Sequence, residues 1–457
     1  MAKYDYDLIV IGSGAAGSIA AALVARAGKR VLLIESHKLG GDSANFGDIP
    51  TQSLMHIGHI YEQAKQAMPF GIRSGAMGYN YPTIAAYKDK VVKRVGDSGN
   101  KRYYDSLGVH VIIGQAHFLS PHEISVNRRH ISSSYIVIAT GAEWTIPEIE
   151  GLHKIGYHTP DTIIDIIRPP KSLFIIGGGS TGLEFARLYS IFGTKVYISE
   201  IAPRLLPRED EEAGEMAEKI LREKNGVTAL LTTRVLRISK DGLGKRIHFI
   251  RGHDERSVRA DEILVASGKS PRVDIGLENA QVSYTPRGIE VNNHLQTSQK
   301  HIFAAGDVLG GFGLTHVALM EGRVVAHNIL QKNLIAPQYT AVPRMTYLYP
   351  EIASVGYSED DLIKRDLEYH KVVVPLSVIG RSQITHLHDG FVKILADKKT
   401  KRLLGATIMA PHAGEAVHEL TLAIQLSLTA EDIAQTLHAF PSWSEAIRIA
   451  CAKIMAK

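Results

Sequence analysis

Two stretches of the chain repeat one order of apolar and polar positions. Residues 6–11 form a short apolar run that predicts a buried strand, a glycine-rich turn follows, and the alanine-rich segment 18–28 predicts a helix. A second strand is predicted at residues 30–34, and it ends at the acid Glu35. The same order returns at residues 171–200, so the pattern predicts two α/β units of alternating strands and helices.

Each repeat carries the fingerprint GxGxxG between its first strand and its helix. The glycines are Gly12, Gly14 and Gly17 in the first copy and Gly177, Gly179 and Gly182 in the second. In both copies an acid, Glu35 or Glu200, stands 23 positions after the first glycine. Such glycines let the backbone approach a pyrophosphate, the helix N-terminus offers it free N–H groups, and the acid accepts hydrogen bonds from ribose hydroxyls. We therefore predict two dinucleotide sites, one for FAD and one for NAD(H).

Composition excludes several classes of protein. A single cysteine, Cys451, among 457 residues rules out an internal disulfide, a CxxC pair and a zinc site of several cysteines. Its apolar helical surroundings predict a core position. The net charge of +5 predicts no nucleic-acid partner. No apolar run reaches about 18 residues and the N-terminal segment holds Asp5 and Asp7, so we expect no membrane insertion, no signal peptide and a cytoplasmic location.

Three further motifs accompany the two fingerprints. They are Ile-Ala-Thr-Gly at residues 138–141, a stretch at 297–307 that ends in Asp307, and the segment 350–356. With these motifs the sequence resembles, over nearly its whole length, the FAD-dependent pyridine-nucleotide disulfide oxidoreductases. That family includes dihydrolipoamide dehydrogenase, glutathione reductase, mercuric reductase and the soluble transhydrogenase.

The resemblance implies a domain organisation. We expect an α/β fold with two Rossmann-like nucleotide-binding domains and a C-terminal α+β dimerisation domain. The expected limits are 1–150 and 272–340 for the FAD domain, 151–271 for the NAD(H) domain and 341–457 for the interface domain. A homodimer is expected because in this family the C-terminal segment completes the flavin site of the partner subunit.

The resemblance also assigns residues to each nucleotide. Glu35 would hold the adenosine ribose of FAD, Asp307 the ribityl chain, and the backbone of Ala318 the pyrimidine edge of the flavin. The residues implied for FAD are Gly12, Gly14, Ala16, Gly17, Glu35, Gly41, Gln52, Ala116, Thr140, Gly141, Gly306, Asp307 and Ala318. Those implied for NAD(H) are Gly177, Gly179, Gly182, Glu184, Glu200, Val235 and Gly268.

Two acids of the second repeat set the expectations for the nicotinamide nucleotide. Glu200 favours NADH over NADPH, because a carboxylate there bonds a free 2′-hydroxyl and repels a 2′-phosphate. Arg204 and Arg208 follow closely and leave the opposite preference open. Glu184 matches the family glutamate near the nicotinamide and the flavin N5, and the alternative is an exposed helix residue.

The catalytic positions of the family are replaced in this chain. Ser43 and Asp48 stand where the family has its two redox cysteines, and Gln52 stands in place of a lysine. Phe440 replaces the acid–base histidine, whereas the partner of that histidine, Glu445, remains. Reduction of disulfides, lipoamide and glutathione is therefore excluded on chemical grounds, and so is reduction of Hg²⁺, which needs thiolates to hold the metal. The candidate catalytic residues are Asp48, Gln52, Glu184 and Glu445.

Some of these positions have a second interpretation. Asp48 precedes a helical pattern at residues 51–67, where an aspartate favours capping of the helix N-terminus. His438 stands two residues before Phe440 and is an alternative source of the lost histidine. On the same helical pattern His56 and His59 offer a pair of metal ligands, although we expect no metal site. His386 and His388 indicate a solvated strand face.

These observations lead to one functional hypothesis and two alternatives. The hypothesis is an NADH-dependent FAD oxidoreductase whose flavin passes electrons directly to a small non-disulfide acceptor such as a quinone or a dye. The first alternative is an enzyme similar to the soluble pyridine nucleotide transhydrogenase. The second is a flavin-binding regulatory protein without turnover.

Overall fold

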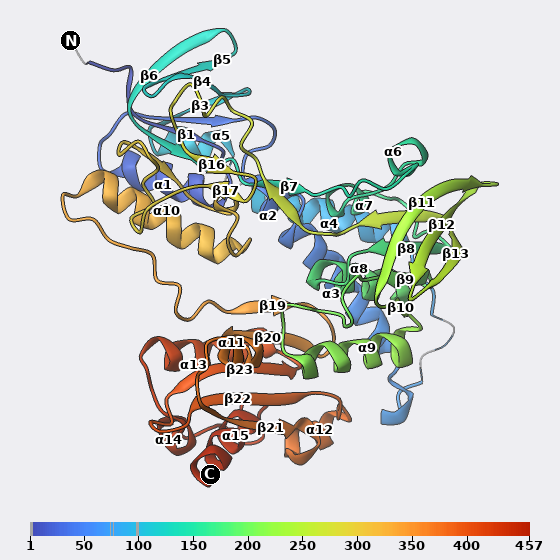
Figure 1. Ribbon diagram of the computed structural model, residues 1–457. Helices are drawn as coiled ribbons and strands as arrows, with labels where there is room; N and C mark the ends of the chain where they lie inside the picture. Colours follow the sequence, from blue (N-terminus) through green and yellow to red (C-terminus); the bar gives the residue numbers. More distant parts are fainter. Residues whose placement is uncertain (1–2, 74, 76, 97–99) are drawn as a thin grey trace.

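The computed structural model describes residues 3–73, 75, 77–96 and 100–457. The larger sheets occupy three regions (Figure 1), with the first repeat at the upper left, the second at the right, and the C-terminal segment, coloured orange to red, below them. The predicted α/β class with a C-terminal α+β region is confirmed.

The first sheet contains the first repeat. Its strands run in the order β3-β2-β1-β6-β5-β4, and β18 also pairs with β6. The strands are β1 Tyr6–Ile11, β2 Val31–Glu35, β3 Val109–Ile113, β4 His117–Ser120, β5 Glu123–Val126, β6 Arg129–Ile138 and β18 Ile302–Ala304. β1 lies parallel to both neighbours, with Leu8 opposite Val31 and Tyr135. The paired ends of these strands, Leu8–Ile11, Val31–Ile34 and Ile136–Ile138, are apolar and buried, which is typical of a parallel sheet covered on both faces.

Helices cover this sheet. They are α1 Ala15–Arg26, α5 Lys101–Ser106 and α10 Thr315–Leu330. α1 and α10 lie side by side (Figure 1), and a Cβ added at Gly322 of α10 would stand 2.3 Å from the carbonyl oxygen of Ala16 in α1. The two helices therefore pack backbone against backbone, which places the first turn of each at the same end of the sheet.

The second repeat forms a smaller parallel sheet in the order β10-β9-β8-β14. Its elements are β8 Ser172–Ile176, α8 Ser180–Ile191, β9 Lys195–Ser199, α9 Glu211–Asn225, β10 Thr228–Leu230 and β14 Glu262–Val265. An antiparallel sheet follows, made of β11 Thr233–Asp241, β12 Gly244–Arg251 and β13 Asp254–Ala260. A ribbon of β7 Ala142–Trp144 and β15 Lys269–Pro271 connects the two nucleotide folds. Two short helices, α6 Leu152–Ile155 and α7 Pro160–Ile163, complete this part. The short strands β16 Tyr284–Thr285 and β17 Gly288–Ile289 lie with the first sheet (Figure 1).

The C-terminal segment folds into an antiparallel sheet with helices against it. The strand order is β19-β20-β23-β22-β21. The strands are β19 Arg344–Thr346, β20 Glu351–Gly356, β21 Tyr369–Pro375, β22 Phe391–Asp397 and β23 Leu403–Ala410. The helices are α11 Glu359–Lys364, α12 Gly380–Thr385, α13 Ala413–Gln425, α14 Ala430–Gln435 and α15 Glu445–Met455. Cys451 of α15 is fully buried in this core, as predicted.

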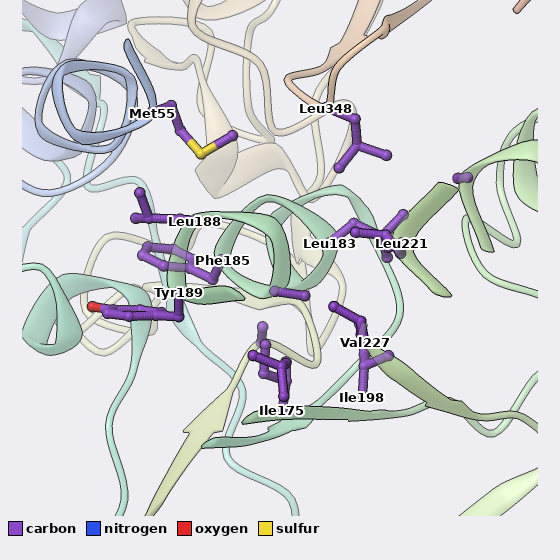
Figure 2. Packing of buried hydrophobic residues seen from close by; sticks show 14 of the residues in the cluster. Met55, Ile175, Leu183, Phe185, Leu188, Tyr189, Ile198, Leu221, Val227 and Leu348 are labelled. Atoms are coloured by element: carbon purple, nitrogen blue, oxygen red, sulfur yellow. The ribbon is translucent and has the colours of Figure 1, made fainter. Parts of the chain in front are cut away.

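Three further helices follow the first repeat: α2 Gly41–Asn45, α3 Asp48–Lys65 and α4 Tyr81–Gly96. Figure 2 shows Met55 of α3 beside Phe185 and Leu188 of α8, with Leu348 of the C-terminal segment in the same apolar cluster. At the edge of this contact the buried guanidinium of Arg187 lies 2.5 Å from the carboxylate of Glu62 in α3. The core thus fixes α8 of the second repeat against α3.

Three expectations about local structure are wrong. The fingerprint helices begin earlier than predicted, at Ala15 and Ser180, because the residues between the last two glycines already have helical geometry. The N-cap of α3 is Gly47 and not Asp48, which is the first helical residue and makes no capping bond. His386 and His388 follow α12 in a loop and do not lie on a strand.

Candidate active site

A cavity of about 1510 Å³ extends between the two nucleotide folds and reaches the C-terminal segment. Both fingerprint loops line it, and so do the loop before α3, the start of α10 and the end of β19. It brings together nearly all the predicted nucleotide-binding positions: Gly12, Gly14, Ala16, Glu35, Gly41, Gln52, Ala116, Thr140, Gly141, Gly177, Gly179, Glu184, Glu200, Val235, Gly268, Gly306, Asp307 and Ala318. Gly17 and Gly182 lie behind its wall.

The glycines of the first fingerprint divide into two kinds. A Cβ added at Gly12 would stand 2.2 Å from the carbonyl oxygen of Ala139, and one added at Gly17 would stand 1.9 Å from that of Gly12. These two glycines therefore permit the close contact of helix and strand. A Cβ added at Gly14 meets no atom within 4 Å, because this residue faces the cavity.

The second fingerprint repeats this division. Added Cβ atoms at Gly177 and Gly182 would stand 2.4 Å and 2.0 Å from backbone carbonyl oxygens, whereas Gly179 has open space in front of it. Each loop thus presents a bare backbone at the N-terminus of a helix, the arrangement that receives a pyrophosphate. The residues present fit two dinucleotides, one on each fold.

The two predicted ribose acids are buried and held. Glu35 is 7% exposed and accepts hydrogen bonds from the N–H of Ser13 at 2.9 Å, its hydroxyl at 2.6 Å and the N–H of His37 at 2.8 Å. Glu200 is 8% exposed and accepts from the N–H groups of Gly178 and Ala202, both at 2.8 Å. Both carboxylates stand at the cavity wall after the second strand of their fold.

The loop before α10 lines the cavity on the side of the first fold. Gly306 has a φ of 83° and donates its N–H to the carboxylate of Glu321 at 2.6 Å, which fixes the loop. Asp307 follows, and burial raises the pKa of its carboxyl group. Across the cavity Lys269 lies 2.5 Å from Asp42.

The positions that replace the family's cysteines are joined by a third residue. The hydroxyl of Thr315, the first residue of α10, donates to the carboxylate of Asp48 at 2.7 Å. The hydroxyl of Ser43 lies 2.5 Å from that of Thr315. Ser43, Thr315, Asp48 and Gln52 all line the cavity. Where the resembled family has its redox disulfide, this chain therefore has two linked hydroxyl groups that end at a carboxylate.

Glu184 lies on α8 at the opposite wall. Its carboxylate accepts a hydrogen bond from the backbone N–H of Tyr347, just after β19, at 2.9 Å. Burial raises the pKa of Glu184 to about 7, the nearby charge of Asp48 adds to this effect, and the Tyr347 bond opposes it. The alternative of an exposed helix residue is wrong, and Glu184 is poised to hold or release a proton near neutral pH.

The C-terminal candidates do not line this cavity. Phe440 is 77% exposed, and a buried carboxylate oxygen of Glu445 has no hydrogen-bond partner among the residues that the structure describes. The Nε2 of His438 stands 2.9 Å from a carboxylate oxygen of Glu419. Within one protomer, then, neither His438 nor Glu445 contributes to the cavity.

The remaining candidates are the two histidines of α3 and Cys451. His59 is half-buried beside Tyr349, with ring centres 4.1 Å apart, whereas His56 is exposed. The described residues hold no group of three or more His, Cys, Asp or Glu side chains that could bind a metal ion. Burial raises the pKa of the Cys451 thiol to about 12.

The chain matches known proteins over nearly its whole length. Residues 6–322 match the family described as pyridine nucleotide-disulphide oxidoreductase, and residues 342–451 match its dimerisation domain. The chain belongs to this family. As a pyridine nucleotide-disulphide oxidoreductase by descent, it is a flavin-dependent oxidoreductase that uses FAD and NAD(P)H, and its dimerisation domain supports a homodimer.

The relatives of this chain include dihydrolipoyl dehydrogenases and mercuric reductases. The chain is 34% identical to a dihydrolipoyl dehydrogenase of Thermus scotoductus, over 97% of this chain and 96% of the relative. It is 30% identical to a mercuric reductase of Bacillus cereus, over 98% of this chain and 71% of the relative.

Two solved structures have a fold similar to that of this chain. The HOCl-induced flavoprotein disulfide reductase RclA from Escherichia coli has a TM-score of 0.88 at 28% identity, with coverage of 98% and 99% of the two chains. LpdA from Mycobacterium tuberculosis has a TM-score of 0.88 at 26% identity, again with 98% and 99% coverage. No helix among the described residues has the length and apolar character needed to span a membrane.

The sequence did not indicate two residues of the site. Thr315 begins α10 three positions before the predicted Ala318, and only the fold shows that its hydroxyl meets Asp48. A hydroxyl residue at a helix start beside a predicted flavin contact was the available signal. Tyr347 acts through its backbone N–H, which leaves no side-chain signal in a sequence.

Proposed function

We propose that this protein is an NADH-dependent flavoprotein that passes electrons from its flavin directly to a small non-disulfide acceptor. The observation that carries the proposal is the Ser43–Thr315–Asp48 chain, which occupies the place of the family's redox disulfide. The only thiol of the chain, Cys451, is fully buried in α15 and does not line the cavity. Electrons leaving a bound flavin have no sulfur relay and need an acceptor that enters the cavity itself.

The NADH preference rests on the second fold. Glu200 presents a buried carboxylate beside Gly178, where the ribose of a nicotinamide nucleotide would lie, and this charge disfavours a 2′-phosphate. Arg204 does not compensate, because its guanidinium bonds Asp360 at 3.2 Å and does not line the cavity.

Each residue of the site has a task in this proposal. FAD and NADH, when bound, supply the chemistry of electron transfer. The bare backbones at Gly14 and Gly179 receive the two pyrophosphates, and Glu35 and Glu200 orient the riboses. Glu184 holds a proton at the nucleotide wall, and Asp48 sets the charge at the former disulfide position.

The test is the behaviour of the two half-reactions without oxygen. NADH should bleach the flavin absorption within the time of a stopped-flow experiment, and NADPH should do so far more slowly. The reduced protein should then be reoxidised by the quinone menadione but not by oxidised glutathione or lipoamide. Reoxidation by a disulfide as fast as by menadione would contradict the proposal, and a flavin that NADH does not bleach would support the regulatory alternative.

A second test measures how many electrons the protein takes up for each FAD. Because the chain has one buried cysteine, an anaerobic dithionite titration should end when only the flavin is reduced, with one two-electron equivalent per FAD. A requirement for twice that amount would mean a further redox centre.

One observation favours a second function. Arg208 and Arg234 are exposed and line the cavity on the side of Glu200, where they could receive a 2′-phosphate. If they do, both nucleotides exchange electrons through the flavin, as in a transhydrogenase. Equal flavin reduction rates with NADH and NADPH, combined with electron transfer from NADPH to a thio-analogue of NAD⁺, would establish this function.

A further inference from the structure

We propose that Ser43, Thr315 and Asp48 form a proton relay that serves the acceptor, so that the acceptor is a two-electron, two-proton compound of the quinone class. The inference rests on the proposed function, because it requires an acceptor that enters the cavity.

The hydrogen bonds give the relay a direction. The hydroxyl of Thr315 donates its only proton to the carboxylate of Asp48, over 2.7 Å. Its oxygen can therefore only accept in the contact with Ser43, so Ser43 donates to Thr315 over 2.5 Å. The chain runs from Ser43 through Thr315 to Asp48, and a shift of each proton along its bond delivers one proton to the carboxylate.

The relay lies where an acceptor must arrive. All three side chains line the cavity, together with the residues implied for the flavin. Asp48 is exposed to the cavity, whereas Ser43 and Thr315 are half-buried, so the carboxylate is the member that an entering molecule can touch. The three residues come from the starts or bodies of the helices α2, α3 and α10.

The relay has a reason to take up a proton when the cavity gains charge. The ammonium group of Lys269 bonds Asp42, and Gln52 is neutral where the family has a lysine. Neither residue therefore places a positive charge directly against Asp48. Negative charge that enters with the electrons repels the carboxylate of Asp48 and attracts a proton to it. Asp48 then binds the proton that Thr315 passes to it.

The reaction balances with an acceptor that needs protons. NADH supplies a hydride, which carries two electrons and one proton, and a hydronium ion from the solvent supplies the second proton through Ser43, Thr315 and Asp48, leaving water. Both carbonyl oxygens of the quinone gain an O–H bond, NADH becomes NAD⁺, and the hydroxyl chain is refilled by the hydronium ion at Ser43. A metal complex that takes single electrons needs no proton, and the relay would give it no advantage.

The experiment compares two acceptors with one set of variants. The FAD-loaded protein is reduced with NADH and mixed without oxygen with either menadione or ferricyanide. Thr315→Val keeps the shape of the side chain and removes the hydroxyl, and we expect it to slow reoxidation by menadione about a hundredfold, within the range of general acid catalysis. Reoxidation by ferricyanide should stay within a factor of about two, as should flavin reduction by NADH.

Further variants keep the test decisive. Ser43→Ala should show the same selective loss, and Thr315→Ser should restore the rate with menadione, because it returns a hydroxyl. The matched control is Thr421→Val on α13, whose hydroxyl bonds the carbonyl of Val417 away from the cavity and should affect neither acceptor. Equal slowing with both acceptors, or no slowing in Thr315→Val and Ser43→Ala, would overturn the relay.

A spectroscopic readout tests the proton itself. The infrared difference between reduced and oxidised holoprotein should contain the C=O stretch of a carboxyl group that becomes protonated on reduction. This band should vanish in Asp48→Asn, shift in Thr315→Val and persist in Glu184→Gln. A band that persists in Asp48→Asn would assign the proton elsewhere and overturn the proposal.

The two proposals fail in different ways. If menadione reoxidises the unmutated protein and disulfides do not, the proposed function holds whatever the variants do. If a disulfide is the faster acceptor, the proposed function fails, and the relay fails with it.

Discussion

The two repeats of this chain share the arrangement of their fingerprint glycines and differ at one position of the helix that follows. In each, the first and third glycines make room for a carbonyl oxygen and the second faces the cavity. The helix of the first copy carries Ile19, which packs against Gly322 of α10. The corresponding place in the second copy is Glu184, whose carboxylate faces the cavity and bonds Tyr347. The second copy thus places an ionisable group at the cavity, at a position where the first copy has an apolar side chain.

The acids of the two copies differ as well. Glu35 is held by a side chain, the hydroxyl of Ser13, in addition to backbone N–H groups. Glu200 is held by backbone alone, because the equivalent of Ser13 is Gly178. A Cβ at Gly178 would stand 2.9 Å from that of Glu200 and 2.8 Å from a methyl group of Leu205, so this position tolerates no side chain. Matching fingerprints thus conceal two different ways of orienting a carboxylate.

The largest effect should come from filling the open glycines. Gly14→Leu places a side chain where a pyrophosphate would lie, and we expect folded protein without flavin. Gly179→Leu should keep the flavin and abolish its reduction by NADH. Absorption spectra and circular dichroism measure both outcomes, and stoichiometric FAD in Gly14→Leu would disprove the assignment of the first copy.

Glu200→Ser should change nucleotide preference next most strongly. Removing the carboxylate removes the repulsion of a 2′-phosphate, and we expect the ratio of flavin reduction rates with NADH and NADPH to fall about tenfold to a hundredfold, equivalent to about 1.4–2.7 kcal/mol. Glu35→Ser is the matched variant in the other copy and should leave this ratio unchanged. An unaltered ratio in Glu200→Ser would show that this acid does not select the nucleotide.

Ser13→Ala should have a smaller effect, confined to the first copy. Glu35 loses the 2.6 Å bond from the hydroxyl and keeps its bonds from backbone N–H groups. A hydrogen bond to a charged group contributes about 1.5–3 kcal/mol, so FAD should bind roughly tenfold more weakly. Fluorescence titration of the flavin-free protein measures this. Gly178→Ala, the nearest equivalent in the second copy, should instead lower the melting temperature through its steric clash.

The smallest expected effect is the pH dependence that Glu184 gives to the second copy. Its pKa of about 7 lies above the ordinary value of 4.5, so the folded chain binds more protons than the unfolded chain between these values. The stability of the flavin-free protein should therefore fall as pH rises from about 4.5 to about 7, and level off above. Melting temperatures across this range should fall less in Glu184→Gln, which cannot ionise, and slightly less in Asp48→Asn. If the difference in melting temperature between the unmutated protein and Glu184→Gln grew above pH 8, another ionisable group would be responsible.

Much of this architecture was predictable because its signals are local. The strands Tyr6–Ile11 and Ser172–Ile176 follow from short apolar runs, and each fingerprint loop follows from glycine spacing. The start of α1 was predicted too late, since Ala15 is helical inside a stretch whose glycines indicate a turn. Local helix propensity alone does not decide whether Ala15 belongs to the turn or to the helix.

The chemistry of the site was less predictable because its contacts join distant residues. Asp48 has the residue type of a helix cap, yet its partner Thr315 is 267 positions away in the chain. Glu184 was indicated by resemblance, but its burial depends on packing that also involves the C-terminal segment. Contacts of this kind appear only when the fold is complete.

The burial of Cys451 has a consequence for how the protein can be inhibited. Electrophiles and heavy metals that inactivate thiol enzymes attack the thiolate, and a fully buried thiol with a pKa of about 12 supplies almost none at neutral pH. The cavity offers such reagents serine, threonine and carboxylate oxygens and the thioether of Met345, but no thiol. Arsenicals and thiol-directed alkylating agents that inactivate a dithiol reductase should leave the cavity of this relative chemically intact.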